Sequence, residues 1–140
     1  MDYIVLDTNA LIMCISPKSK YRRAWKAFLD GEFTLCVSNE VLEEYSEVLG
    51  RNLSPAIADY IIQTIMMRAN VLLFDPHFRC NLISEDPDDN KFVDCAFAAN
   101  AKYIVTEDHH FNVLKRISFP KINIIGIDDF CRELSNAVTQ

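Results

Sequence analysis

The sequence predicts an α/β fold in which a central, mainly parallel sheet is covered by helices on both faces. Short apolar runs alternate with amphipathic helical patterns along the chain, which is typical of parallel sheets. Four of these runs are continuously apolar, as expected for strands buried on both faces; they read YIVL, VLLF, YIV and INII. These observations predict a three-layer α/β/α arrangement.

The N-terminal third predicts one strand and two helices. Residues 3–6 form a β-prone run, and Asp7, which follows it, is a residue type that favours turns and helix N-caps. A short helix is expected over residues 10–15. A second is expected over residues 20–29, where apolar side chains recur at helical spacing until Gly31.

The middle of the chain predicts a strand, two helices and another strand. Residues 33–37 form the strand, and Ser38 is placed to cap an amphipathic helix that runs to Leu49. Ser54 followed by proline starts the next helix, which we expect to reach about residue 70 before a strand at residues 71–74. The expected core positions of that helix are Ile57, Ile61, Ile65 and Met66.

The C-terminal half begins with a polar, proline-containing loop over residues 75–90, with a possible short strand at residues 80–83. The remaining predicted elements are a helix over 91–100, a strand over 103–105, a short helix over 112–116, a strand over 122–125 and a helix over 128–134.

The composition indicates one domain over residues 1–140. A chain of 140 residues that is 50% hydrophobic can bury roughly two-thirds of its unfolded surface, and no linker-like stretch divides it. No apolar run approaches the roughly 18 residues that span a bilayer, and the N-terminus lacks the pattern of a signal peptide. The five cysteines contain no C-x-x-C pair. We therefore expect a cytoplasmic protein with free thiols and no membrane association.

Acidic residues follow the predicted strands where a parallel α/β sheet binds its ligands, beyond the carboxyl ends of the strands. Asp7 ends the first strand, Asp108 follows the YIV strand, and Glu44 lies early in the helix after the second strand. Each has an ordinary explanation as a cap or a solvated side chain. A further acidic group surrounds the next helix start and contains Asp86, Asp88, Asp89 and Asp94.

The combination of these acids indicates a metal site. Carboxylates brought together without cations repel, and one or more would be driven to take up a proton. Oxygen ligands suit Mg²⁺ or Mn²⁺. Such ions can activate water and stabilise the oxygens of an in-line displacement at phosphorus.

Four segments in this order and spacing resemble the PIN-domain family, and the resemblance covers nearly the whole chain. It is nearest to the VapC-type toxins of toxin–antitoxin pairs. The segments are Val5–Asn9 (VLDTN), Ser38–Tyr45 (SNEVLEEY), Asp86–Phe92 (DPDDNKF) and Tyr103–Asp108 (YIVTED).

The resemblance implies an Mg²⁺- or Mn²⁺-dependent endoribonuclease, a hydrolase that cleaves single-stranded RNA. It carries the metal-binding and catalytic acids onto Asp7, Glu44 and Asp108, and it makes Thr8, Asn9 and Thr106 supporting polar groups. It also implies a possible antitoxin partner and a possible homodimer. In toxin relatives, helices like the one at residues 54–70 join such contacts.

The sequence departs from the family pattern at one acid. The third family acid usually lies some 18 positions before the last one, and Asn90 stands there. An amide can bind a cation through its carbonyl oxygen but supplies no charge. We expect Asp94, four residues later on the same helix face, to replace it as ligand and catalytic acid, with Asp89 as the second choice.

The net charge of −6 opposes non-specific binding to nucleic acid, so any RNA contact must be local. One basic cluster follows the first strand and is either a solvated face or a surface for RNA phosphates. It contains Lys18, Lys20, Arg22 and Arg23, together with Lys26.

Two other functions stay open at this point. A PIN module weakened in catalysis by Asn90 could act in protein or RNA binding. An aspartyl phosphoryl-transfer domain would use Asp7 as nucleophile, but phosphatases of that type usually carry a second Asp where this chain has Asn9.

Overall fold

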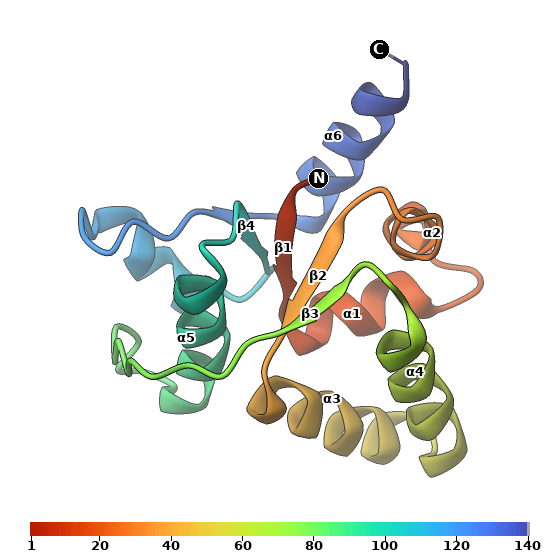
Figure 1. The fold of residues 1–140 in the computed structure, drawn as a ribbon, viewed down its shortest axis with the longest axis horizontal. Coiled ribbons are helices and arrows are strands. Elements are labelled where there is room, and N and C mark those ends of the chain that lie inside the picture. Colours follow the sequence, from red (N-terminus) through yellow and green to blue (C-terminus); the bar gives the residue numbers. More distant parts are fainter. Residues whose placement is uncertain (140) are drawn as a thin grey trace.

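The computed structural model describes residues 1–139, with side chains to residue 136, and within them builds a five-stranded parallel sheet of order β3-β2-β1-β4-β5 (Figure 1). Every pair of neighbouring strands is parallel. The strands are β1 (Tyr3–Leu6), β2 (Thr34–Val37), β3 (Val71–Leu73), β4 (Tyr103–Val105) and β5 (Ile124–Ile125). The predicted α/β class with a parallel central sheet is confirmed.

Helices lie on both sides of the sheet. The helices α1 (Thr8–Ile15), α2 (Arg22–Leu29), α3 (Asn39–Asn52) and α4 (Pro55–Met67) join β1 to β2 and β2 to β3. Helix α5 (Asn90–Ala99) packs on β1, β2 and β4, away from α1 and α2, whereas α6 (Ile127–Thr139) packs on α2 (Figure 1). Two 3-10 helices complete the fold, η1 (Pro87–Asp89) and η2 (His109–Arg116).

Side-chain caps fix where the helices begin, as the sequence predicts. Ser38 accepts a hydrogen bond from the backbone of Val41, and Ser54 accepts one from Ile57. Each cap satisfies an amide that the first helical turn leaves without an internal partner. The helix after β2 is thereby set at the carboxyl edge of the sheet.

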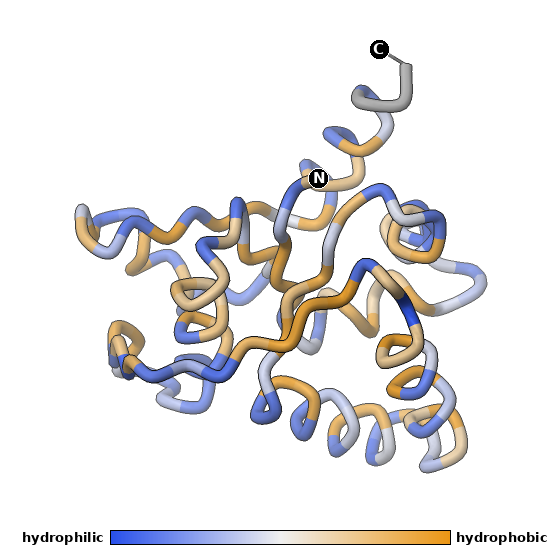
Figure 2. Tube along the Cα trace, in the orientation of Figure 1, coloured by the Kyte–Doolittle hydropathy of each residue, from blue (hydrophilic) through white to orange (hydrophobic). Residues whose placement is uncertain are grey.

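Figure 2 shows hydrophobic residues along the strands, whereas α3 and α4 alternate between hydrophobic and hydrophilic residues. Tyr45 of α3 is fully buried, and its hydroxyl donates to the Leu6 carbonyl at 2.5 Å. This bond ties α3 to the end of β1. Glu44 directly precedes Tyr45, and Asp7 directly follows Leu6. The bond therefore also brings the backbones of Glu44 and Asp7 near one another.

Helix α4 is less buried than its periodicity predicts. Ile61 and Ile65 lie in the core, as expected, but Ile57 is 44% exposed and Met66 is 52% exposed. The expectation that all four positions are core is wrong for these two. Helix α4 packs mainly on α3, so only one narrow side of it is covered.

The possible strand at residues 80–83 does not form. The backbone of Ile83 is bound by the side chain of Asn90, and the amide of Cys80 donates to Asp94. Side chains of α5 therefore take the hydrogen bonds that a neighbouring strand would have made. The predicted short helix at 112–116 is a 3-10 helix that begins earlier, at His109.

No helix in the described part of the chain combines the length and apolar character needed to cross a membrane. The five cysteines are all free.

Candidate active site

A cavity of about 290 Å³ opens at the carboxyl ends of β1 and β4, where the acids were expected to meet. Six of the twelve residues that line it carry carboxylates. The lining residues are Asp7, Thr8, Asn9, Glu44, Val48, Arg51, Asn52, Asp86, Asp88, Asp89, Phe92 and Asp108.

Asp7 is held at the base of this cavity by three hydrogen bonds. Its backbone amide donates to Val105 at 3.1 Å, one carboxylate oxygen accepts from the Ala10 amide at 2.8 Å, and the other accepts from the Thr106 hydroxyl. The Thr106 hydroxyl oxygen also accepts from the Asp108 amide at 3.0 Å. Thr106 therefore fixes Asp7 and Asp108 relative to each other.

Glu44 reaches the cavity from α3 and is bound from two sides. The Thr8 hydroxyl donates to one carboxylate oxygen, and the Lys91 ammonium lies 3.1 Å from the other. Burial by itself would lower the pKa of Lys91, but the hydrogen bond to Glu44 and the charges of nearby carboxylates raise it. Lys91 is thus a fixed cation at the rim, which the motif analysis missed although it directly follows Asn90.

Asp89 lies beside η2 with one oxygen that has no hydrogen bond. This oxygen, Oδ2, is buried, and so is Nδ1 of His110, which lies 3.6 Å away. Burial, followed by the negative charges of Asp86, Asp108 and Asp7, raises the pKa of Asp89 to about 7. Burial likewise raises the pKa of Asp7 to about 6, with the charges of Asp108 and Glu44 adding to the effect.

The PIN-domain model matches residues 3–110, which contain the whole cavity. The chain belongs to the PIN-domain family. No curated protein sequence matches it.

Solved structures share the fold of this PIN domain. A VapBC2 structure from Rickettsia felis, bound to a DNA fragment from its promoter, is 18% identical and covers 89% of this chain and 98% of that chain, with a TM-score of 0.62. DNA-bound VapBC from Salmonella typhimurium is 21% identical. The match covers 91% of this chain and 99% of that chain, with a TM-score of 0.59.

A third similar structure is VapC20 of Mycobacterium tuberculosis, described as a toxin that cleaves the sarcin-ricin loop. It is 14% identical, covers 78% of this chain and 92% of that chain, and gives a TM-score of 0.57. At these identities the similarity concerns the fold.

Asn90 and Asp94 of this PIN domain lie outside the cavity lining. The Asn90 amide group donates to the Ile83 carbonyl at 2.8 Å and accepts from the Ile83 amide at 3.0 Å, so both of its ends are used. Asp94 accepts from the Cys80 amide at 2.9 Å and lies 3.4 Å from Arg79. Both side chains hold the loop before η1.

Of the two acids proposed for the third position, Asp89 lines the cavity and Asp94, the first choice, does not. Asp94 shares a helix face with Asn90, as its spacing predicts, but that face is turned toward the loop and not toward the cavity. Asp89 precedes the helix and lines the cavity, together with Asp86 and Asp88. The structure brings together Asp7, Thr8, Asn9, Glu44, Asp89 and Asp108 from the predicted site, with Thr106 bonded to Asp7 below them.

The predicted basic cluster is not part of this cavity. Arg23 is paired with Glu32 at 2.7 Å, and Arg22 donates to the Ile15 carbonyl. Lys18 and Lys20 are exposed. The guanidinium that lines the cavity is that of Arg51, which sequence reasoning missed because α3 extends one turn beyond its predicted end.

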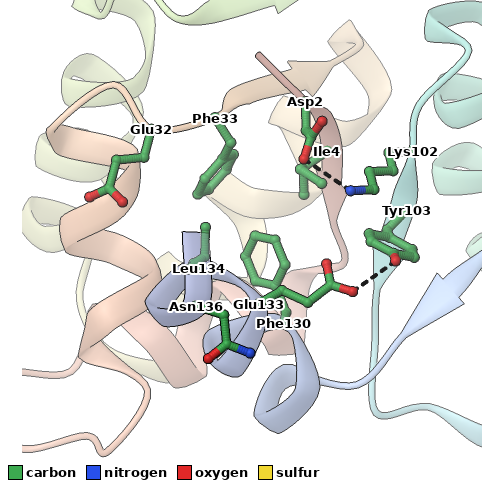
Figure 3. A pocket seen from close by; sticks show the side chains of 10 residues that line it. All are labelled: Asp2, Ile4, Glu32, Phe33, Lys102, Tyr103, Phe130, Glu133, Leu134 and Asn136. Atoms are coloured by element: carbon green, nitrogen blue, oxygen red, sulfur yellow. Dashed lines mark hydrogen bonds and ion pairs between the residues drawn. The ribbon is translucent and has the colours of Figure 1, made fainter. Parts of the chain in front are cut away.

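The cavity chemistry fits a divalent cation. Its ligands are hard oxygens, several are crowded at one sheet edge, and Asp89 presents a buried oxygen without a hydrogen bond. A second hollow, at the amino ends of the strands, lacks this character (Figure 3). There, Asp2 pairs with Lys102, and the Tyr103 hydroxyl donates to Glu133.

The substitution Asn90→Asp, which restores the usual family acid, should destabilise the protein. An ionised Asp cannot donate to the Ile83 carbonyl and would set a charge against it. We expect a loss of about 1–3 kcal/mol in the free energy of unfolding, measured with urea in the presence of chelator. Asn123→Asp, at an exposed position, should stay within about 0.5 kcal/mol of the unsubstituted protein. Equal or greater stability of Asn90→Asp would contradict a structural role for Asn90.

Without divalent cations, the stability of the protein should fall as the pH rises from about 4 to about 7. The pKa of Asp7 rises from 3.8 to about 6 on folding, so the folded form binds the proton more tightly. The stabilisation is complete below the unfolded pKa and is lost as the pH passes the folded one. The rise corresponds to about 3 kcal/mol. Urea unfolding in chelator should find Asp7→Asn more stable than the unsubstituted protein at pH 7, with the difference vanishing in acid; lower stability of Asp7→Asn at pH 7 would contradict this.

Proposed function

We propose that this PIN domain is a metal-dependent endoribonuclease that cleaves single-stranded RNA and serves as the toxin of a toxin–antitoxin pair. The observation that carries the proposal is the carboxylate cavity at the edge of the sheet, where Asp7, Glu44, Asp89 and Asp108 converge. The structural similarity to VapC20, described as a toxin that cleaves the sarcin-ricin loop, supports the choice of RNA as substrate.

Asp7, Asp89 and Asp108 line the cavity that would receive the cation, Mg²⁺ or Mn²⁺, with Glu44 at the rim. When bound, such an ion neutralises the carboxylates, acts as a Lewis acid toward a phosphodiester and lets water attack at neutral pH. The raised pKa values of Asp7 and Asp89 have the same origin as this affinity. Negative charge that is costly without a counter-ion becomes favourable with one.

The protein's own side chains would position the substrate. Thr106 keeps Asp7 from rotating, and the Thr8 hydroxyl keeps Glu44 turned toward the cavity. Lys91 and Arg51 supply positive charge beside the acids, where an RNA phosphate would otherwise be repelled. The chain needs such local cations because its net charge is −6.

The residue at position 9 favours this function over an aspartyl phosphotransferase. Phosphatases of that type usually carry a second Asp where this chain has Asn9, which lines the cavity. The reading as a catalytically weakened binding module rests on Asn90. That hypothesis loses support because Asp89, adjacent to Asn90, supplies a carboxylate to the cavity.

Asp7→Asn should reduce cleavage of a single-stranded RNA oligonucleotide by roughly 100-fold or more, because a charged ligand is lost while the N-cap can persist. Cleavage should be absent in EDTA and return with added Mg²⁺ or Mn²⁺. Asp94→Asn, which changes an acid outside the cavity, is the matched control and should stay within several-fold of the unsubstituted rate. Unchanged cleavage by Asp7→Asn, or cleavage that persists in chelator, would reject the proposal.

We infer that the antitoxin partner would bind an apolar groove on the side of the molecule formed by α1, α2 and α4. The groove has a volume of about 660 Å³. Ile57 and Tyr60 line it while 44% and 69% exposed, which leaves uncovered apolar surface of the kind that marks interaction sites. Two structures of similar fold are of VapBC bound to DNA. A second copy of this chain is the competing occupant.

Co-expression with a candidate antitoxin taken from a short neighbouring gene, followed by size-exclusion chromatography, tests the groove. The unsubstituted protein should form a complex, and Ile57→Glu should reduce it at least roughly tenfold by placing a charge in a buried interface. Met67→Glu, on the same helix but outside the groove lining, should bind normally. A complex that Ile57→Glu leaves intact, or a homodimer that Ile57→Glu abolishes with no complex formed, would contradict an antitoxin site here.

A further inference from the structure

His110 lies on η2, next to Asp89 and Asp108 of the cavity but in an adjoining hollow that Glu85 and His109 also line. This 3-10 helix begins directly after Asp108, whose carboxylate accepts from the His110 amide at 2.9 Å and so fixes the backbone there. The side chain of His110 is 24% exposed, whereas that of its neighbour His109 is 79% exposed. The adjacent histidines therefore differ in burial, and His110 is the more enclosed of the two.

The imidazole of His110 is surrounded by carboxylates that do not hydrogen-bond to its Nδ1. Nδ1 lies 3.4 Å from Oδ1 of Asp108 and 3.6 Å from Oδ2 of Asp89, while Nε2 lies 3.3 Å from Glu85. Among the described side chains, Nδ1 of His110 and Oδ2 of Asp89 are the two buried polar atoms without a hydrogen-bond partner. Such atoms are rare in native proteins and call for an unseen water or ion.

The spacing of these atoms suits an ion. A cation about 2.1 Å from two donors at the tetrahedral angle holds them about 3.4 Å apart. Asp86 joins the same group, because one donor atom each from Asp86, Asp89 and His110 all lie within 4.8 Å of one another. A protonated imidazole would instead need one carboxylate placed to accept from Nδ1, and neither Asp89 nor Asp108 is so placed.

We propose that His110 is a direct ligand of a divalent cation, together with Asp86 and Asp89, and that it gives this site a preference for transition-metal ions over Mg²⁺. Mg²⁺ binds oxygen ligands and dehydrates reluctantly, whereas imidazole favours first-row transition metals. The ligand set also compensates for Asn90, whose amide is committed to Ile83. Asp86 and Asp89 also line the cavity of the proposed nuclease, and the proposal rests on that function only for its biological use.

The test uses the full chain with Mn²⁺ alone, followed by calorimetry and by pulsed electron paramagnetic resonance. The resonance experiment detects nitrogen bound directly to Mn²⁺. The chain has three histidines, so the source of a nitrogen signal can be assigned by substitution. We expect a nitrogen coupling that His110→Gln removes and that His77→Ala and His109→Ala keep. His77 is exposed in the loop before η1 and His109 is adjacent to the site, which makes them matched controls.

Affinity provides the second readout. His110→Gln should weaken Mn²⁺ binding by roughly tenfold or more and change Mg²⁺ binding by less than about threefold. Circular dichroism and urea unfolding of the same variant check that it folds, and His110→Ala repeats the test without a side chain that could bind metal. Equal losses for both ions would show a structural role and overturn the proposal.

Three other results would also overturn it: no Mn²⁺ binding, a Mn²⁺ signal without nitrogen coupling, or a coupling lost only in His109→Ala. The last would assign the bound nitrogen to His109 and not to His110. Failure of the nuclease function would look different. Nitrogen coupling without RNA cleavage in any metal would reject the nuclease function and support His110 as a ligand. Cleavage supported by Mn²⁺ without nitrogen coupling would support the nuclease function and reject His110 as a ligand.

Discussion

The Thr106 hydroxyl joins the two strands on which the cavity is built. It donates to Asp7 at the end of β1 and accepts from the amide of Asp108 beyond the end of β4. Because β1 and β4 are parallel neighbours, their carboxyl ends lie side by side, and one short side chain can bridge the residues that follow them. Glu44 and Asp89 then complete an acidic cavity whose deepest member, Asp7, is already fixed.

The energetic consequence is that ionised carboxylates in this cavity lower the stability of the folded protein. Burial and mutual repulsion raise the pKa values of Asp7 and Asp89 to about 6 and about 7, so near neutral pH the fold without a cation tolerates its own charges poorly. Lys91 is paired with Glu44 at the rim, and Arg51 lines the same cavity. A divalent ion would relieve the repulsion among the carboxylates, which links the stability of the domain to the chemistry proposed for it.

The sequence predicted the sheet and most of the cavity because these depend on local rules. Continuous apolar runs predict buried parallel strands, and acids that follow such strands must share an edge, as Asp7 and Asp108 do.

The choice between Asp89 and Asp94 depends on contacts between residues that are distant in the sequence. Asp94 is bound to Cys80 across a loop without regular structure, and no periodicity signals that contact. The surroundings of His110 could not be predicted either, since the positions of Glu85 and Asp89 around it depend on how the same loop folds. The solvent exposure of Ile57 was missed because an apolar stripe looks the same whether a core or a partner covers it.

The central claim is that distant acids form one cation-binding cavity at the edge of the sheet. A crystal of the full chain soaked in Mn²⁺ and measured for anomalous scattering tests it most directly. The account predicts a peak about 2.0–2.3 Å from carboxylate oxygens of the cavity, Asp89 among them. A crystal with no anomalous peak in this cavity, or with the ion bound only at a surface remote from Asp7 and Asp108, would contradict the account.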